Sequence, residues 1–319
     1  AKRRGRNRAA VALAEPCAVL AEQGEGLGAA VACQDGGRSP DVGSLPVLYI
    51  ADLLSKNYAE APSPVPVRQA IGVAAPLCFM FTGGSTGSPK CVEATHAMAL
   101  HEVRCYPQIA EGLTARDRVL QQTSVFWAAS AWGQVDIALA FGAAICVSSS
   151  GTPTARQLRE AAVTVLGAAP SALAAYLPAD VPALRCVFSW GEAMPAALAA
   201  RFRAAGVRTV ELLISTEYWL SFWSSEPPGA SGLQVFDPVI GIGFGVLPPS
   251  AAPTGEPAAA ELVDHIGAVG ELCLRGPAVM RGYRRTAAEA LDPSTGPPRR
   301  PARKAAWAAA PRSSPPKEA

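Results

Sequence analysis

The sequence feature that most constrains the fold is a segment rich in glycine and hydroxyl residues, residues 81–90, that directly follows an apolar run. The run, residues 76–81, has the composition of a buried strand. Gly83, Gly84 and Gly87 allow backbone conformations that are closed to other residues, so consecutive amide groups can converge on one anion. The segment also holds short donors and one cation, namely Thr82, Ser85, Thr86 and Lys90. It therefore predicts a loop that binds phosphate.

Two other structures have a similar composition. A Walker phosphate loop is excluded because Lys90 follows Pro89, where that motif requires glycine. A flexible linker is also rich in glycine and serine. A linker, however, is not framed by a strand and a helix, and residues 93–96 lead into a helix that we predict to begin near Ala97. The expected unit is a strand, a phosphate loop and a helix.

Two further segments place polar or glycine residues next to predicted strands. An apolar strand expected over residues 210–214 ends at the sequence Ser-Thr-Glu, residues 215–217. A Thr-Glu pair in this position is also typical of a solvated strand end. Residues 267–283, GAVGELCLRGPAVMRGY, predict a strand over 271–274 and a turn at 276–277. The glycines of this second segment also fit an ordinary hairpin, but a hairpin does not explain the whole pattern.

Taken in order, these segments resemble the signatures of the adenylate-forming enzymes, the AMP-binding synthetase and ligase superfamily. Residues 82–91 resemble the loop T-S-G-[ST]-T-G-x-P-K-G, and residues 213–217 partly resemble Y-G-x-T-E. Residues 267–283 closely resemble G-x-x-G-E-L-x-[IL]-x-G-x-x-[VM]-x-x-G-Y. The departures from the first two patterns are Gly83, Cys91, Leu213 and Ile214.

A fourth segment, residues 189–195 (SWGEAMP), resembles the G-G-E-x-[LM]-P turn that lines the nucleotide pocket of this superfamily. A helix is predicted after it, over residues 196–205. Trp190 stands where the superfamily has a glycine. Its indole either fills the pocket or offers a different stacking face, and the sequence leaves both open.

The resemblance implies an α/β fold, the large N-terminal domain of the superfamily, in which stacked β-sheets rich in parallel strands are covered by helices. It implies ATP-dependent activation of a carboxylic acid to an acyl-adenylate, with Mg²⁺, of the acyl-CoA synthetase or carrier-linked adenylation type. The implied thiol acceptor is coenzyme A or the phosphopantetheine of an acyl-carrier domain.

The resemblance also assigns roles to individual residues. Lys90 would hold the β- and γ-phosphates, Thr216 would face the α-phosphate, and Glu217 would help to hold Mg²⁺ directly or through water. These three are the implied catalytic residues. The implied nucleotide-binding residues are Thr82, Gly83, Gly84, Ser85, Thr86, Gly87, Gly191 and Glu192.

The segment that would shape the acid pocket is residues 126–132, FWAASAW. Superfamily members that activate α-amino acids usually have an aspartate here to pair with the ammonium group, and this chain has none before Asp136. An apolar, aromatic pocket favours an acyl or aryl acid over an amino acid. The same aromatic residues would equally suit a buried core.

Composition bounds the remaining function classes. With 319 residues, of which 50% are hydrophobic, the chain can bury a substantial core. The most apolar stretch, residues 131–147, contains Gln134 and Asp136 and is too short for a membrane span. No two of the 8 cysteines have the spacing of a zinc site, which favours reduced thiols in a cytoplasmic protein. Between residues 11 and 283, 15 basic residues face 23 acidic ones, which argues against a nucleic-acid-binding body.

The expected organisation is a basic N-terminal segment of low order (1–45), a partial AMP-binding domain (46–285) and a disordered tail rich in Ala, Pro and Arg (286–319). The Arg-rich start also fits an organelle-targeting segment. After Tyr283 we find no T-G-D segment and no room for the superfamily's small C-terminal domain with its mobile lysine. We therefore expect a chain truncated at both ends, with impaired activity.

Whether the chain is an active ligase stays open on the sequence alone. One alternative is a non-catalytic nucleotide-binding relic or an incomplete gene product. Another is an unrelated kinase or ATPase with a phosphate loop, which the absence of Walker spacing disfavours.

Overall fold

The computed structural model describes residues 71–82, 90–123, 127–148, 152–226, 234–248, 263 and 268–284. It also gives two short strands nearer the N-terminus, β1 (Val19–Ala21) and β2 (Val47–Tyr49), which pair in parallel. Most of the predicted phosphate loop, residues 83–89, and the predicted tail lie outside the described residues.

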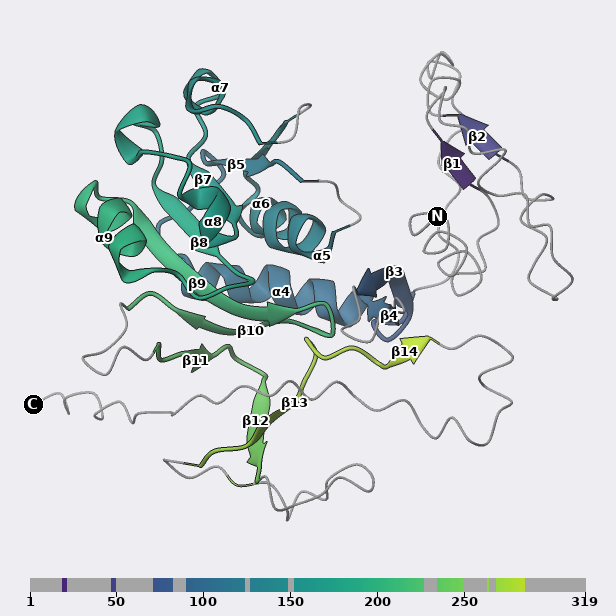
Figure 1. Cartoon of the computed structure of the whole chain (residues 1–319). Coiled ribbons are helices and arrows are strands. Elements are labelled where there is room, and N and C mark those ends of the chain that lie inside the picture. The colour runs from purple at the N-terminus through teal and green to yellow at the C-terminus, as the bar shows by residue number, and fades with distance from the viewer. Residues whose placement is uncertain are drawn as a thin grey trace, which may run out of the picture.

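A seven-stranded sheet forms the centre of the described structure, in the order β11-β10-β9-β8-β7-β5-β6 (Figure 1). In chain order the strands are β5 (Arg118–Gln121), β6 (Ala144–Val147), β7 (Val165–Ala168), β8 (Cys186–Ser189), β9 (Arg208–Ser215), β10 (Tyr218–Ser224) and β11 (Asp237–Pro238). From β6 to β9 all neighbours are parallel, whereas β10 and β11 are antiparallel. The four residues of β7 and of β8 are all buried, as expected for central parallel strands.

Helices cover both faces of this sheet. They are α4 (His96–Ile109), α5 (Ala128–Ser130), the π-helix η3 (Ala131–Val135), α6 (Asp136–Phe141), α7 (Ala155–Glu160), α8 (Pro170–Leu173), the 3₁₀ helix η4 (Pro178–Asp180) and α9 (Ala196–Ala204).

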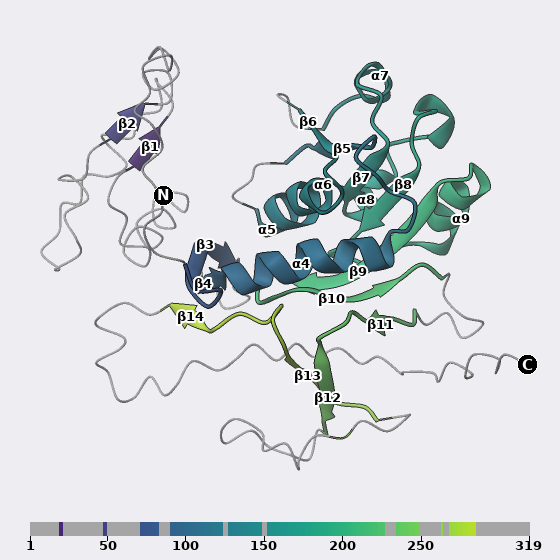
Figure 2. The same cartoon turned by 180° about the vertical axis from the view of Figure 1, so that it is seen from behind.

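Alternate strand residues enter two different hydrophobic clusters. Val165 packs with α4 and α6 on one face, whereas Leu166 packs with α7, α8 and α9 on the other. The period of two follows from the alternation of side chains along a strand. Figure 2 shows the same elements from behind. Of the described helices, none is long and apolar enough to cross a membrane.

Two smaller antiparallel sheets flank the large one. β3 (Pro76–Thr82), β4 (Lys90–Thr95) and β14 (Tyr283–Arg284) form the first, in the order β14-β4-β3, at the start of α4 (Figure 2). β12 (Gly243–Leu247) and β13 (Glu271–Arg275) form the second.

The elements predicted from sequence are present, with one correction. The strands expected over 76–81, 210–214 and 271–274 are β3, β9 and β13, and the helices expected near 97 and over 196–205 are α4 and α9. The expected order of strand, loop and helix was wrong, because β4 lies between the loop and α4. The loop therefore joins two antiparallel strands and does not lead directly into a helix N-terminus.

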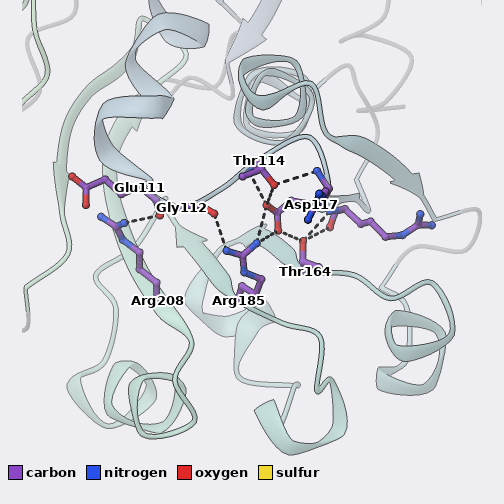
Figure 3. A network of polar contacts seen from close by, with 9 residues as sticks. Glu111, Gly112, Thr114, Asp117, Thr164, Arg185 and Arg208 are labelled. Carbon is purple, nitrogen blue, oxygen red and sulfur yellow. Dashed lines mark hydrogen bonds and ion pairs between the residues drawn. The ribbon is translucent and has the colours of Figure 1, made fainter.

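A polar network ties the end of α4 to the amino-terminal edge of the large sheet (Figure 3). Its centre is Asp117, which is only 1% exposed. Asp117 accepts hydrogen bonds from the Thr114 amide (2.7 Å) and the Thr164 hydroxyl (2.8 Å). Nη1 of Arg185 lies 2.9 and 3.0 Å from its two oxygens. We call these four residues the Asp117 network.

Candidate active site

A cavity of about 970 Å³ opens at the carboxyl-terminal ends of the parallel strands. Its wall includes Gln122 after β5, Ala168 at the end of β7, Trp190 after β8 and Ser215 at the end of β9. Open α/β sheets bind ligands at this edge. The location and size therefore make this cavity the candidate active site.

Residues from three predicted motifs meet in the wall of this cavity. They are Thr82 and Lys90 from the loop motif, Gly191 and Glu192 from the turn after β8, and Thr216 and Glu217 from the turn between β9 and β10. Thr82 and Lys90 are cross-strand partners, so the loop between them begins and ends at the cavity. The other predicted loop residues, Gly83, Gly84, Ser85, Thr86 and Gly87, lie outside the described residues.

The carboxylate of Glu217 is oriented by two hydroxyl groups. The Tyr283 phenol donates a hydrogen bond of 2.8 Å to Oε1, and the Ser215 hydroxyl donates to Oε2. Burial and the neighbouring Glu217 raise the pKa of Tyr283, so the phenol stays protonated and able to donate. The Lys90 ammonium lies 5.1 Å from the centroid of the Tyr283 ring. Tyr283 thus links three motifs, and sequence reasoning had not selected it as a site residue.

The turn after β8 combines a left-handed glycine with a buried indole. Gly191 has a φ of +87°, which favours glycine, and the Glu192 carboxylate accepts a 2.9 Å hydrogen bond from the Ser171 amide. Hydrogen bonding from Ser171 lowers the pKa of Glu192. Trp190 is 7% exposed, and a Cβ added at Gly167 would lie 2.3 Å from its ring. The indole therefore fills space against the strand backbone, and its remaining surface belongs to the cavity wall.

The aromatic stretch predicted to shape the acid pocket does line the cavity. Trp127, which is 62% exposed, and Trp132 both contribute to the wall, whereas Phe126 lies outside the described residues. Trp132 stacks on Trp219, with ring centroids 3.9 Å apart. The alternative of a buried core does not hold for Trp127.

A buried carboxylate in the same wall was missed by sequence reasoning. Glu102 on α4 is 1% exposed, and the Tyr106 hydroxyl donates a 2.9 Å hydrogen bond to its Oε1. Its Oε2 has no hydrogen-bond partner among the described residues. Burial, and secondly Asp136 nearby, raise the pKa of Glu102 well above its usual range. Burial raises the pKa of Asp136 itself to about 7.

A sequence signal for Glu102 did exist. It lies on the face of α4 that also carries the buried Met98, Cys105 and Ile109. Helical periodicity over residues 96–109 would have placed a carboxylate on an apolar face, where an ionisable group demands an explanation.

Comparison with known proteins identifies the family of this chain. The family model described as "AMP-binding enzyme" matches residues 4–284. The chain belongs to this family. The match begins well before the first motif that we recognised in the sequence.

Curated relatives of this AMP-binding enzyme are much longer proteins. The chain is 25% identical over 245 residues to the delta-poly-L-ornithine synthetase of Acinetobacter baumannii, covering 74% of this chain and 17% of the relative. It is 32% identical over 222 residues to nonribosomal peptide synthetase 8 of Aspergillus fumigatus, covering 67% of this chain and 2% of the relative. The chain therefore spans only a small part of the relatives that it matches.

Solved structures support the same fold. VinN in complex with L-aspartate superposes with a TM-score of 0.65 at 24% identity, covering 89% of this chain and 69% of VinN. ATP-bound MatB from Rhodopseudomonas palustris gives a TM-score of 0.70 at 16% identity, covering 90% and 56%. The N-terminal subdomain of Klebsiella oxytoca NpsA, in complex with 3-hydroxybenzoyl-AMSN, is 25% identical with a TM-score of 0.59, covering 78% and 63%.

Proposed function

We propose that this chain catalyses ATP-dependent activation of a carboxylic acid to an acyl-adenylate. Membership of the AMP-binding enzyme family supports acid adenylation in general. The observation that carries the proposal is that three motifs, at residues 82–90, 191–192 and 216–217, meet in one cavity. That cavity presents a cation, Lys90, and an oriented carboxylate, Glu217.

The residues of the wall suit the parts of ATP in different ways. Lys90 is exposed and can pair with phosphate oxygens, and Thr82 would add a short hydroxyl donor. Thr216 would donate to the α-phosphate, and Gly191 lets the backbone of the turn approach the nucleotide. Glu192, exposed at the rim, would lie beside the base or ribose.

Mg²⁺ fits the donor set at Glu217. Hard cations prefer carboxylate oxygens, and the two hydroxyl donors fix the orientation of this carboxylate. The described residues hold no cluster of three or more His, Cys, Asp or Glu side chains that could hold a metal. Glu217 would therefore share the ion with phosphate oxygens, directly or through water. When bound, the ion would offset the negative charge of the phosphates.

The proposed reaction is an in-line displacement. A carboxylate oxygen of the acid forms a bond to the α-phosphorus of ATP, and the bond from that phosphorus to the bridging oxygen breaks. Pyrophosphate leaves with the electron pair. Lys90 and the amides of the loop would stabilise the charge on the departing phosphates.

A thiol would accept the activated acid in a second half-reaction. Relatives that are named nonribosomal peptide synthetases favour the phosphopantetheine of a carrier domain over coenzyme A. Attack of the thiolate on the acyl carbon would form a thioester and release AMP.

Two measurements on the same sample test the proposal. Calorimetry would follow Mg·ATP binding, and isotope exchange between ATP and pyrophosphate would follow the first half-reaction. We expect Lys90→Ala and Glu217→Gln each to weaken binding about tenfold or more, because each removes one charged contact to the phosphates or their metal. Arg116→Ala, at an exposed position before β5, is the control and should leave both readings unchanged.

Each other outcome has a distinct meaning. Binding without exchange for any acid would indicate a non-catalytic nucleotide-binding protein. Release of inorganic phosphate in place of pyrophosphate would indicate a kinase-like or ATPase-like site. Absence of Mg·ATP binding by a wild-type chain that is folded by circular dichroism would overturn the proposal.

A further inference from the structure

We infer that the acid activated in this cavity carries a protonated amine, and that the Glu102 carboxylate pairs with that amine. The inference rests on the proposed function, since it names the substrate class of the same cavity. It starts from one observation. An almost fully buried carboxylate forms part of the cavity wall, and one of its oxygens has no hydrogen-bond partner among the described residues.

The protein itself supplies Glu102 with no cation among the described residues. The salt bridges there join Arg156 to Glu160, Arg185 to Asp117 and Arg281 to Glu93. The ionisable groups that act on Glu102 are Tyr106, on the same helix, and Asp136, on α6. Tyr106 donates one hydrogen bond, and Asp136 adds a second acidic group.

Such an arrangement is costly without a ligand. An ionised carboxylate that is buried without a partner costs several kcal/mol, so the free protein keeps Glu102 neutral. An ammonium group brought into the cavity would reverse the balance. It would supply the missing positive charge and donate to the free oxygen, and Glu102 would then release its proton.

A second group in the wall also has a buried oxygen that lacks a hydrogen-bond donor among the described residues. Oε1 of Gln122 is buried and has no hydrogen-bond partner among the described residues, and Gln122 lines the cavity too. Both groups offer acceptor oxygens, and an ammonium group offers three donors and no acceptor. The rings of Trp127, Trp132 and Trp219 line the same cavity, and aromatic rings also attract cations. The wall therefore matches an amine better than it matches a hydrocarbon or a second carboxylate.

This inference revises the expectation drawn from residues 126–132. That segment has no acidic residue, which favoured an acyl or aryl acid. The structure brings a carboxylate to the cavity from a different element, α4. Wherever that carboxylate ionises, an acid with an amine gains a contact that the corresponding acid without it lacks.

The test compares pairs of acids that differ only in the amine, using pyrophosphate exchange. Suitable pairs are L-phenylalanine with 3-phenylpropanoate, 5-aminopentanoate with pentanoate, and β-alanine with propanoate. We expect at least one amine-bearing acid to exceed its partner in kcat/KM by about tenfold or more, which corresponds to about 1.4 kcal/mol. Glu102→Gln should remove that preference, mainly by raising KM for the amine-bearing acid.

The matched control variant is Glu111→Gln. Glu111 lies just beyond the end of α4 and is exposed, and its side chain is outside the cavity wall. It undergoes the same chemical change as Glu102 and should leave the preference intact.

A binding measurement separates recognition from a structural role of Glu102. Calorimetry at pH 7 in two buffers of different ionisation enthalpy counts the protons released when each acid binds in the presence of Mg²⁺ and α,β-methylene-ATP, in which the bond that the reaction breaks is replaced by one that cannot be cleaved. We expect release of about one proton per amine-bearing acid by the wild type, and none by Glu102→Gln or with the partner acid. Because this readout uses the wild type, it remains decisive even if Glu102→Gln folds poorly.

Several outcomes would overturn the inference while the proposed function stands. One is that the protein uses both members of every pair equally, and another is that the preference survives in Glu102→Gln. A third is that an amine-bearing acid binds without proton release, and a fourth is that Mg·ATP binds but none of the tested acids does. A preference for acids with a neutral acceptor in place of the amine would mean that Glu102 donates from its protonated form. Failure to bind Mg·ATP at all would instead overturn the proposed function.

Discussion

Two carboxylates of equal burial lie at opposite edges of the large sheet. Asp117, at the amino-terminal edge, and Glu102, in the cavity at the carboxyl-terminal edge, are each 1% exposed. Asp117 accepts hydrogen bonds from Thr114, Thr164 and Arg185 (Figure 3). Glu102 accepts one, from Tyr106, and keeps an oxygen without a partner among the described residues.

This difference indicates that Asp117 stabilises the fold, whereas we infer that Glu102 binds a ligand. The cost of burying a charge is offset only by a cation and by donors. At Asp117 the protein supplies both, so the residue fastens the start of β5 to β7 and β8 through Thr164 and Arg185. At Glu102 the protein supplies one donor and no cation among the described residues. Burial alone therefore does not distinguish the two roles, whereas partners do.

The largest expected effect on stability comes from removing Asp117, the carboxylate whose partners the protein supplies. Asp117→Ala leaves the Thr114 amide and the Thr164 hydroxyl without their acceptor and leaves Arg185 unpaired. We expect the free energy of unfolding to fall by about 3 kcal/mol, toward the lower limit for buried pairs because half of the Arg185 side chain is exposed. Urea unfolding measures it, with the exposed Asp180→Ala as control. A loss below about 1 kcal/mol would show that the Asp117 network is not a structural anchor.

The next effect concerns pH and the acidic neighbour of Glu102. Burial raises the pKa of Asp136 from 3.8 to about 7, so the folded state binds a proton more tightly than the unfolded state. The resulting stabilisation is complete below pH 3.8 and is lost as pH rises through about 7. Asp136→Asn has no such proton to lose. At pH 8 the free energy of unfolding of Asp136→Asn should therefore exceed that of the wild type by about 2 kcal/mol. This is less than the full pKa shift of Asp136 implies, because buried sites relax around a charge.

Urea midpoints at pH 5, 6, 7 and 8 would check this dependence, with Asp180→Asn as the control at an exposed position. The difference between the two free energies of unfolding should widen from pH 5 to about pH 7 and then level off toward pH 8. Parallel curves for the wild type and Asp136→Asn would mean that Asp136 is compensated in the folded protein, which would weaken the contrast with Asp117.

The places of the motif residues relative to the strands could be predicted, because they depend on local chain geometry, while their roles stay a prediction. Thr82, Lys90, Gly191 and Thr216 lie at or next to strand ends, and strand ends can be located from apolar runs. Parallel strands bring their carboxyl ends to one edge of the large sheet, which places Gly191 and Thr216 together, whereas Thr82 and Lys90 come from the antiparallel pair β3 and β4 of a separate sheet.

What could not be predicted depends on contacts between distant segments. The hydrogen bond from Tyr283 to Glu217 joins residues that are 66 positions apart, and β4 pairs with both β3 and the distant β14. The packing of Trp190 on Gly167 also depends on a neighbouring strand. Glu102 was not predicted as a site residue. Its position on the helix indicated burial, but only the assembled cavity shows what it faces.

A smaller effect on stability is expected from removing the Tyr106 hydroxyl, the one described group that donates a hydrogen bond to Glu102. Tyr106→Phe removes the hydrogen bond to Oε1 and leaves the ring, which is fully buried and packs edge-on against Phe188. We expect a loss of about 1 kcal/mol in the free energy of unfolding, the usual value for one hydrogen bond. Glu102→Gln in the same background should recover part of that loss, since glutamine is buried without having to take up a proton. A loss equal to that of Asp117→Ala would erase the distinction between the two carboxylates.

The smallest effect comes from an ion pair that resembles the Asp117 pair only in its distance. Arg156 and Glu160 on α7 lie 2.8 Å apart, but their side chains are 77% and 59% exposed. Solvent screens this pair, and Glu160 stands at the helix C-terminus, where a negative charge is unfavourable. Glu160→Gln should therefore change the free energy of unfolding by no more than about 0.5 kcal/mol, with the residual effect removed by 1 M salt. A larger loss would mean that distance, and not burial with its partners, decides what a carboxylate contributes to this fold, and the reasoning that assigns Glu102 to a ligand would lose its basis.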